Sequence, residues 1–283
     1  MNVGIIGVGA MGMGVARALR DKGFSVAVRD IVPEREAEAA TYGCLVPGSA
    51  AAVASRSEVV ITLVVDAAQT RSVIDEIGRG ARCIMMCSTI APSDTEAIAE
   101  GLPLLDAPIS GGPARARAGT LSVMASGSDA LLAACEPVLD AMAAKCFRVG
   151  SRPGDGSRMK VVNNMMAAAN LAAGCEAMAM AAKLGLDLGQ ALAVVSASSG
   201  ASWILGDRME RALAGDYAPR AAARVLAKDI GLFVHEARKL GLTAPMAECA
   251  REIFHDTVAR GLGEEDDAAV FKRYLEAWSG PAT

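Results

Sequence analysis

An apolar run followed at once by three closely spaced glycines constrains this chain more than any other feature. Residues 2–6, NVGII, have the pattern of a short buried strand, and Gly7, Gly9 and Gly12 follow within a segment that opens a helical pattern. A strand, a tight turn and a helix in immediate succession predict a βα unit with the glycines at the carboxyl end of the strand. The N-terminal part of the chain should therefore be an α/β sheet.

The same alternation continues to about residue 150. Further β-type runs occur at residues 24–28, 59–65 and 82–86, and helical patterns cover residues 11–22 and 34–41. Strands that alternate with helices favour parallel βαβ units with helices on both faces of the sheet. This part of the chain is predicted to be a Rossmann-type α/β domain.

The pattern changes after residue 150. The segment SRPGDGS, residues 151–157, interrupts it with proline and glycine, and Ser157 is placed to cap a long helix that runs to about residue 184. Helical patterns then continue almost to the end. A length of 283 residues allows one large domain or two modest ones. We predict a Rossmann-type domain over residues 1–155 and an all-helical domain over residues 156–283.

Composition excludes several functions. Lysine and arginine number 28 against 32 acidic residues, so nucleic-acid binding is not expected, because neutralising phosphates requires a clustered excess of positive charge. The longest uncharged run, residues 188–206, contains polar side chains such as Gln190 and Ser196, which would lack partners in lipid. We expect this run to form buried helices and not a membrane span.

The numbers and spacing of cysteine and histidine bear on the cellular location and on metal binding. Seven cysteines, an odd number, predict reduced thiols and a cytoplasmic location, and Cys83 and Cys87 lie in an apolar run where packing is expected. The two histidines, His235 and His255, are too few and too widely spaced for a zinc site, so no metal is predicted.

The glycine turn suits a dinucleotide. Gly7 allows a tight turn, Gly9 lets the backbone approach a pyrophosphate, and Gly12 permits close packing of the helix. The amides of Ala10 and Met11, at the helix N-terminus, would face the phosphates. An ordinary glycine-rich βα turn is the alternative interpretation.

Asp30 ends the second strand run, eighteen residues after Gly12, where an acidic side chain accepts hydrogen bonds from an adenosine ribose. This favours NAD, because the 2′-phosphate of NADP would meet a like charge, although Arg29 beside it could offset the repulsion. NADP is therefore the alternative cofactor. The alternative role for Asp30 itself is to start a turn before Pro33.

Three further segments complete a pattern: residues 106–113, DAPISGGP, residues 156–164, GSRMKVVNN, and the pair Lys228-Asp229. Together with GVGAMG and in this order, they resemble the β-hydroxyacid dehydrogenase family, which includes 3-hydroxyisobutyrate, L-threonate and 6-phosphogluconate dehydrogenases and tartronate semialdehyde reductase. The resemblance covers nearly the whole chain. It implies an NAD(P)-dependent oxidoreductase of a small carboxylate substrate.

The resemblance also implies roles, and physical reasons accompany two of them. The Ser110-Gly111-Gly112 segment exposes a hydroxyl and unobstructed amides, which suits a carboxylate. Lys160 and Asn164, four residues apart on one helix, project from the same face. Lys160 would be the catalytic acid/base, because a desolvated lysine near a helix N-terminus and a cationic nicotinamide should have a pKa below about 10.4. Asn164 would bind the substrate.

Two more cofactor contacts are implied by the resemblance alone. The Ser88-Thr89 pair looks like the short family loop beside the nicotinamide, which makes Thr89 a cofactor residue. Lys228 resembles the family lysine that closes over the cofactor. Its alternative is a surface lysine paired with Asp229.

The particular substrate stays open. Residues 200–220 are most similar to the L-threonate dehydrogenase branch, but that branch tends to carry His-Gln where this chain has Asn163-Asn164, which is more like the hydroxyisobutyrate and semialdehyde-reductase branches. No basic cluster suits a phosphorylated substrate. An imine reductase, which usually lacks a lysine at the position of Lys160, and a non-catalytic nucleotide-binding module are the alternative classes.

The helix expected over residues 157–184 carries apolar side chains around much of its circumference. Part of that surface should be buried against another subunit, so a homodimer or homotetramer is expected, as the resemblance also implies. The active site is predicted in a cleft between the domains, with Ser110, Lys160 and Lys228 contributed by different elements.

Overall fold

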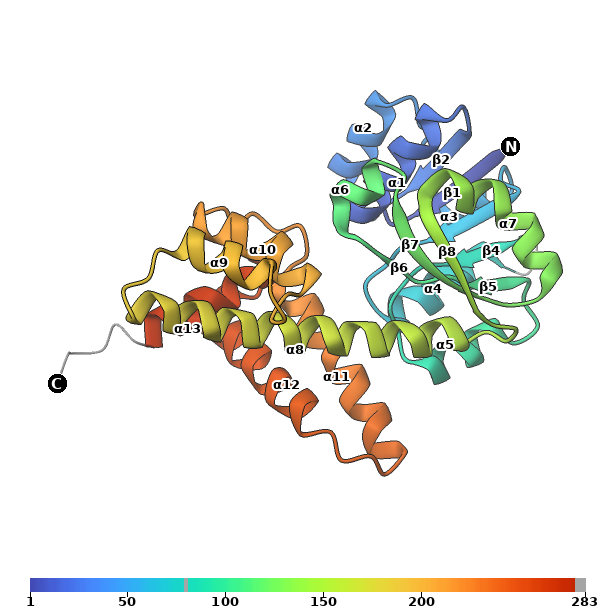
Figure 1. Ribbon diagram of the computed structural model, residues 1–283. Helices are drawn as coiled ribbons and strands as arrows, with labels where there is room; N and C mark the ends of the chain where they lie inside the picture. The colour runs from blue at the N-terminus through green and yellow to red at the C-terminus, as the bar shows by residue number, and fades with distance from the viewer. Residues whose placement is uncertain (79–80, 278–283) are drawn as a thin grey trace. The chain divides into compact units, whose positions relative to one another are not determined.

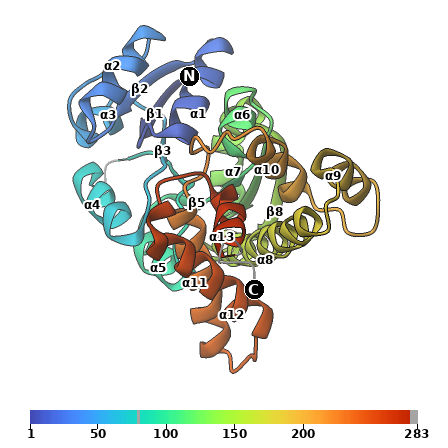
Figure 2. The same cartoon turned by 90° about the vertical axis from the view of Figure 1, so that its left-hand side faces the viewer.

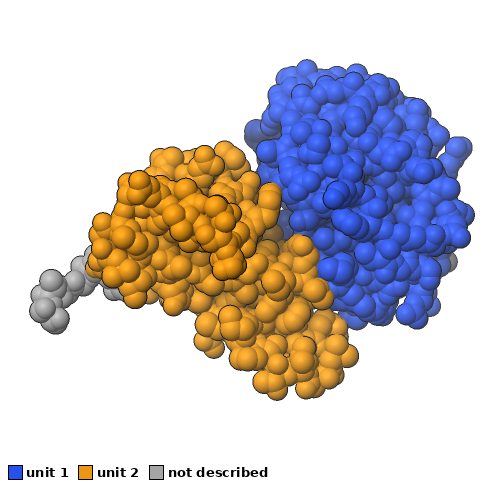
Figure 3. Space-filling model, in the orientation of Figure 1, with its two compact units in different colours: residues 1–160 blue, residues 161–283 orange. Residues whose placement is uncertain are grey.

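The computed structural model describes residues 1–78 and 81–277. The chain divides into two compact units, residues 1–160 and residues 161–283 (Figure 3). The division falls within one long helix. The predicted domain boundary after residue 155 stays a prediction.

Unit 1, residues 1–160, is built on a mixed sheet with the strand order β2-β1-β3-β4-β5-β7-β6, and β8 pairs with β7. The strands β1 to β5 are parallel, β7 is antiparallel to β5 and β6, and β8 is parallel to β7. Their bounds are β1 Asn2–Ile6, β2 Ser25–Arg29, β3 Val59–Thr62, β4 Ile84–Met86, β5 Leu104–Asp106, β6 Ile109–Ser110, β7 Leu121–Ser126 and β8 Ala143–Gly150 (Figure 1).

Helices cover both faces of this sheet, because successive side chains of a strand point to opposite faces. In β1, Ile5 packs in a core with side chains of α1, α6 and α7, whereas Ile6 packs in a second core with side chains of α3, α4 and α5. The helices of unit 1 are α1 Ala10–Asp21, α2 Pro33–Thr41, α3 Ala50–Ala54, α4 Ala67–Ile77, α5 Pro92–Ala99, α6 Gly112–Arg117 and α7 Asp129–Met142.

The strand order determines where a ligand can bind. β1 pairs with β2 on one side and with β3 on the other, so the connections that leave these strands diverge. A crevice forms at the carboxyl end of the strands at such a switch point. The glycine segment that follows β1 therefore lies at this crevice.

Unit 2, residues 161–283, is helical throughout its described part, apart from one isolated bridge between Ala222 and Asp266. Its core joins side chains of five helices, among them Leu171 of α8, Met209 of α10 and Phe254 of α12. The helices are α8 Asp155–Lys183, which begins in unit 1, α9 Leu188–Ser196, α10 Trp203–Leu213, α11 Ala223–Lys239, α12 Pro245–Thr257 and α13 Val270–Ala277, with short turns at Val258–Leu262 and Asp267–Ala269. Figure 1 shows α8 as one unbroken helix, and Figure 2 views it nearly end-on.

A charged pair lies inside unit 2. Arg208, 6 % exposed, donates from Nε to Asp267 Oδ1 at 2.6 Å, and Arg211 donates to the neighbouring Asp266 at 3.0 Å. Burial raises the pKa of Asp267 to about 7, although Arg208 opposes the shift. Ion pairing makes the burial of both charges tolerable.

Among the described residues one helix, α8, has the length and hydropathy of a membrane span. Six of its small or apolar residues are nevertheless in the core of unit 2, namely Ala168, Leu171, Ala172, Cys175, Met178 and Ala179. This is the pattern of the central helix of a packed domain.

The predicted fold class is confirmed, and three expectations are corrected. The sheet is not wholly parallel, because β7 runs antiparallel to β5 and β6, and β8 runs parallel to β7. The run at residues 188–206 is not buried throughout, since no residue of α9 is buried. Ser157 is not the N-cap of the long helix, because α8 begins at Asp155 and the Ser157 hydroxyl donates elsewhere, to Asp106.

Candidate active site

Two of the three glycines are required by the turn between β1 and α1. Gly7 has a φ of +94°, which L side chains rarely adopt, and a Cβ there would lie 2.4 Å from the carbonyl oxygen of Leu63. A Cβ at Gly12 would lie 2.0 Å from the carbonyl oxygen of Gly7. Any side chain at either position would force the backbone apart.

Gly9 has a different environment. It is the N-cap of α1, and a Cβ there would lie 3.4 Å from the Arg35 guanidinium, with no backbone atom in the way. Gly9 and Ala10 line a pocket of about 290 Å³. The first-turn amides of α1, which include those of Ala10 and Met11, have no carbonyl partner earlier in the helix. An unobstructed helix N-terminus beside a pocket fits the pyrophosphate of a dinucleotide.

Three arginines line the same pocket, Arg17, Arg35 and Arg117. Arg117 pairs with Asp21 at 2.5 Å, and the Arg17 guanidinium stacks 3.4 Å above the ring of Tyr42. Positive charge at this position favours a ligand that carries phosphate groups.

Asp30 lies directly after β2 and is 5 % exposed. Its Oδ2 accepts the Val8 amide at 2.7 Å, and its Oδ1 accepts the Val32 amide at 2.9 Å. The carboxylate therefore braces the glycine turn against the β2–α2 connection. A carboxylate has about four acceptor positions, so these two bonds leave capacity for a ribose.

The arginine that faces Asp30 is not the one expected from the sequence. Arg29 is paired with Glu36 at 2.8 Å. Burial raises the pKa of Glu36, but the hydrogen bonds from Arg29 and the Asp30 amide, together with the Arg29 charge, lower it below its ordinary value. Arg35 instead places Nη1 3.8 Å from Asp30 Oδ1. The sequence did not lead us to predict a role for Arg35. Its position in the first turn of α2, soon after Asp30, was the feature that could have indicated one.

The segment after β6 has a backbone conformation that requires glycine at two positions. Gly111 has a φ of +134° and Gly112 a φ of +74°, both in the region that favours glycine. Ser110, the last residue of β6, is only partly buried, and the side chain of Arg115 packs over Gly111. A partly exposed hydroxyl beside a backbone without side chains can contact a small anion.

Thr89 follows β4 and is half-buried. Its neighbour Ser88 is 2 % exposed and accepts the Val64 amide at 3.0 Å, which ties the residues after β4 to those after β3. Since β1, β3 and β4 are parallel, Thr89 belongs to the same edge of the sheet as the glycine turn.

Lys160 is the sixth residue of α8 and is only 8 % exposed. Lysine is rarely buried to this degree, because removing an ammonium from water costs free energy. A buried lysine in a dinucleotide-binding protein is a candidate for proton transfer.

Asn164, one turn further along α8, is held by two side chains of unit 2. Its Nδ2 donates to Asp229 Oδ2 at 2.6 Å, and its Oδ1 accepts from Asn163 at 3.0 Å. Lys228 pairs with the other oxygen of Asp229 at 2.7 Å. Asp229, which is 4 % exposed, thus joins two predicted site residues. Sequence reasoning gave Asp229 no functional role, although its place beside Lys228 was visible.

The predicted residues therefore form two groups. The glycine turn and Asp30 lie together in unit 1, and Asn164 and Lys228 meet at Asp229 in unit 2. Lys160 belongs to the start of α8, in unit 1.

Two family models match successive parts of the chain. Residues 2–150 match the NAD binding domain of 6-phosphogluconate dehydrogenase, and residues 154–274 match the family described as NAD-binding of NADP-dependent 3-hydroxyisobutyrate dehydrogenase. An L-threonate dehydrogenase of Escherichia coli O6:H1 is 39 % identical over 96 % of this chain and 94 % of its own. A 2-(hydroxymethyl)glutarate dehydrogenase of Eubacterium barkeri is 31 % identical, with the same two coverages.

Solved structures of similar proteins have the same fold as this chain. A 3-hydroxyisobutyrate dehydrogenase from Salmonella typhimurium has 38 % identity and a TM-score of 0.90, and the match covers 96 % of this chain and 99 % of that one. An imine reductase from Pseudomonas sp., with 22 % identity and a TM-score of 0.66 over 96 % of this chain and 98 % of its own, shares the fold.

The fold and the glycine turn define a dinucleotide-dependent oxidoreductase with a Rossmann-type unit and a helical unit. Within that class, the chain belongs to the 3-hydroxyisobutyrate dehydrogenase-like family of β-hydroxyacid dehydrogenases. The predicted family, the predicted class of enzyme and the NAD(P) cofactor are thereby confirmed.

Proposed function

We propose that the chain transfers a hydride between NAD(P) and a small hydroxy acid, with Lys160 as the general acid/base. The observation that carries this proposal is the burial of Lys160 near the start of α8 in a chain of this family. Bound NAD(P) would supply the hydride-transfer chemistry at the carbinol carbon. In oxidation Lys160 takes the hydroxyl proton, and in reduction it donates that proton to the forming alkoxide.

The other predicted residues orient the substrate. Asn164 has one N–H directed to Asp229, and its second N–H would bind the substrate hydroxyl or carboxylate. Ser110, Gly111 and Gly112 would bind the carboxylate end.

The cofactor contacts are assigned to unit 1 and to Lys228. Gly9, Ala10 and Met11 would approach the pyrophosphate, and Thr89 and Lys228 would contact the nicotinamide half. Asp30 would accept from the adenosine ribose, which favours NAD over NADP.

Substrates of the 3-hydroxyisobutyrate, L-threonate and tartronate semialdehyde type are proposed. Support comes from the relatives named L-threonate dehydrogenase and 3-hydroxyisobutyrate dehydrogenase, at 39 % and 32 % identity. The absorbance of NADH or NADPH should be followed at about 340 nm with each acid or semialdehyde in turn. Turnover of none of them, by a protein that binds NAD, would contradict the proposed substrate types.

We further propose a cytoplasmic homodimer or homotetramer. Apolar side chains are exposed on two helices of unit 2, including Met166 and Met180 of α8, each 53 % exposed, and Val194 of α9, 64 % exposed. Burial of such surface against a second copy removes it from water. Sedimentation at micromolar concentration should give at least twice the monomer mass of 29.0 kDa. A monomer alone would disprove this assembly.

A further inference from the structure

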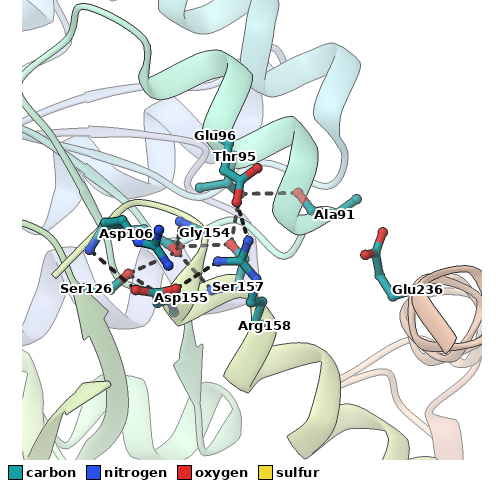
Figure 4. A network of polar contacts seen from close by, with 12 residues as sticks. Ala91, Thr95, Glu96, Asp106, Ser126, Gly154, Asp155, Ser157, Arg158 and Glu236 are labelled. Carbon is teal, nitrogen blue, oxygen red and sulfur yellow. Dashed lines mark hydrogen bonds and ion pairs between the residues drawn. The ribbon is translucent and has the colours of Figure 1, made fainter. Parts of the chain in front are cut away.

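The last residue of β5, Asp106, is fully buried and has no role in the site described above. Its Oδ2 accepts the backbone amides of Gly154 and Ser157, each at 2.9 Å, and the hydroxyl of Ser126 at 3.2 Å. Its Oδ1 accepts the Ser157 hydroxyl at 3.0 Å. Figure 4 shows these groups converging on one carboxylate.

Of the donors, Ser157 lies in the first turn of α8 and Gly154 immediately precedes the helix. Ser126 in turn accepts the Gly156 amide at 2.8 Å. The first amides of a helix have no partner within it. Here Asp106 and Ser126 supply those partners from β5 and β7, for Gly154, Gly156 and Ser157. The helix is therefore capped by side chains of the sheet.

The packing around these hydrogen bonds is close. A Cβ on Gly156 would lie 2.6 Å from the carbonyl oxygen of Met124 and 2.9 Å from that of Asp106. The hydroxyl of Thr95, on α5, lies 2.8 Å from the Ser157 hydroxyl and adds a third element. The first turn of α8 has little freedom to shift relative to the sheet.

The negative charge of the Asp106 carboxylate is also favourable at the N-terminus of α8. A negative group stabilises the N-terminus of a long helix through the helix dipole. Burial raises the pKa of Asp106, and the hydrogen bonds from Ser157, Gly154 and Ser126 oppose that shift.

We infer that Asp106 is a positioning residue for Lys160, an inference that rests on the function proposed above. Lys160 follows Ser157 by three residues, about 4.5 Å along the helix axis. A rigid first turn fixes the depth and rotation at which the lysine side chain leaves α8. Misplacement of a catalytic group by about 1 Å can reduce turnover by roughly a hundredfold.

The test compares three variants. Asp106→Asn keeps the shape but replaces one acceptor oxygen with a donor, and Ser157→Ala removes one hydroxyl from the network. Ser57→Ala is the matched control, because it removes a buried hydroxyl of unit 1 that bonds the Val53 carbonyl, far in sequence from α8. We expect kcat to fall by roughly 10- to 100-fold in Asp106→Asn and less in Ser157→Ala, with the NAD dissociation constant unchanged within about twofold.

Two further readouts separate positioning from general destabilisation. The primary deuterium isotope effect on kcat should rise in both network variants, because the chemical step becomes slower than product release. Hydrogen exchange should accelerate in the peptide that contains residues 152–162 and not elsewhere. Ser57→Ala should change neither.

The inference is overturned if both network variants keep the kcat of Ser57→Ala, or if exchange at the start of α8 is unchanged. Failure of the proposed function has a different signature, which is full turnover by Lys160→Ala or no turnover by the unmodified chain. In that event the exchange measurement alone decides whether Asp106 holds α8.

Discussion

Lys160 is the side chain on which the proposed chemistry depends, and its replacement gives a direct test. Lys160→Ala should lower kcat by roughly two to four decades, because positioned proton transfer commonly contributes that much. Binding of NAD should change little, since the glycine turn is untouched. Steady-state kinetics and NAD titration measure both quantities. Lys145→Ala, an exposed lysine of β8, is the control, and near-normal turnover by folded Lys160→Ala would remove the assignment.

Arg35 sets a second prediction, because its guanidinium faces Asp30 at 3.8 Å and flanks the pocket beside Gly9. It can offset the repulsion between Asp30 and a 2′-phosphate. Arg35→Ala should therefore reduce kcat/KM with NADP by about tenfold and with NAD by much less. Equal losses with the two cofactors would show that Arg35 does not contact the 2′ position.

Asp30 accepts two backbone amides and is proposed to contact the ribose, and one substitution should affect both roles. Asp30→Ser should raise kcat/KM with NADP relative to NAD, because the like charge is removed. It should also weaken both cofactors, since Val8 and Val32 lose their acceptor. The two kcat/KM values of the unmodified protein provide the check, because a higher value with NADP would contradict the ribose assignment.

Among the secondary-structure elements, the β1–α1 turn allows a paired experiment. A Cβ at Gly12 meets backbone oxygen at 2.0 Å, whereas one at Gly9 meets only a flexible guanidinium at 3.4 Å. Gly9→Ala should keep the free energy of unfolding within about 1 kcal/mol but weaken NAD binding by at least tenfold. Gly12→Ala should reduce both the free energy of unfolding and the affinity for NAD. Urea unfolding and NAD titration distinguish them, and unimpaired NAD binding by Gly9→Ala would exclude close approach of the pyrophosphate.

The elements that could be predicted from the sequence are those with local signals. The strand at residues 2–6 and the long helix, within two residues at each end, follow from apolar periodicity and from glycine and proline. β6 and β8 have no such signal, because β6 contains two residues and most of β8 is exposed. Their pairing with β7 is a tertiary contact.

The same limit applies to the candidate site. The glycine turn is local and could be recognised, but the partners of Asp106 follow it by 20, 48 and 51 residues and come from other parts of the fold. Arg35 and Asp229 likewise gain their positions from packing between elements. Spacing along the chain does not reveal such contacts.

For the chain as a whole, the raised pKa of Asp267 leads us to predict how the free energy of unfolding depends on pH. Its folded-state pKa of about 7 lies above its ordinary value of 3.8, so the folded protein holds an additional proton between these two pH values. The contribution of Asp267 to the free energy of unfolding is therefore greatest below about pH 4 and declines toward pH 7, by at most about 1.4 kcal/mol per pH unit.

Asp267→Asn cannot titrate and supplies the comparison. The difference in unfolding free energy between the unmodified protein and this variant should decrease from about pH 5 to about pH 7 and then level off. Urea unfolding across this range measures it. A difference independent of pH would show that Asp267 is ionised throughout, as a partner of Arg208.

The continuity of α8 affects how such chains can be recombined. The helix starts among residues of the sheet unit and ends in the core of the helical unit, so an exchange of modules at residue 160 would cut a helix in its interior. A chimera of two relatives should instead be joined in the loop before Asp155. It would then inherit Gly156 and Ser157 from one parent and Asp106 and Ser126 from the other. Compatibility of those four residues, more than overall identity, should decide whether the hybrid is active.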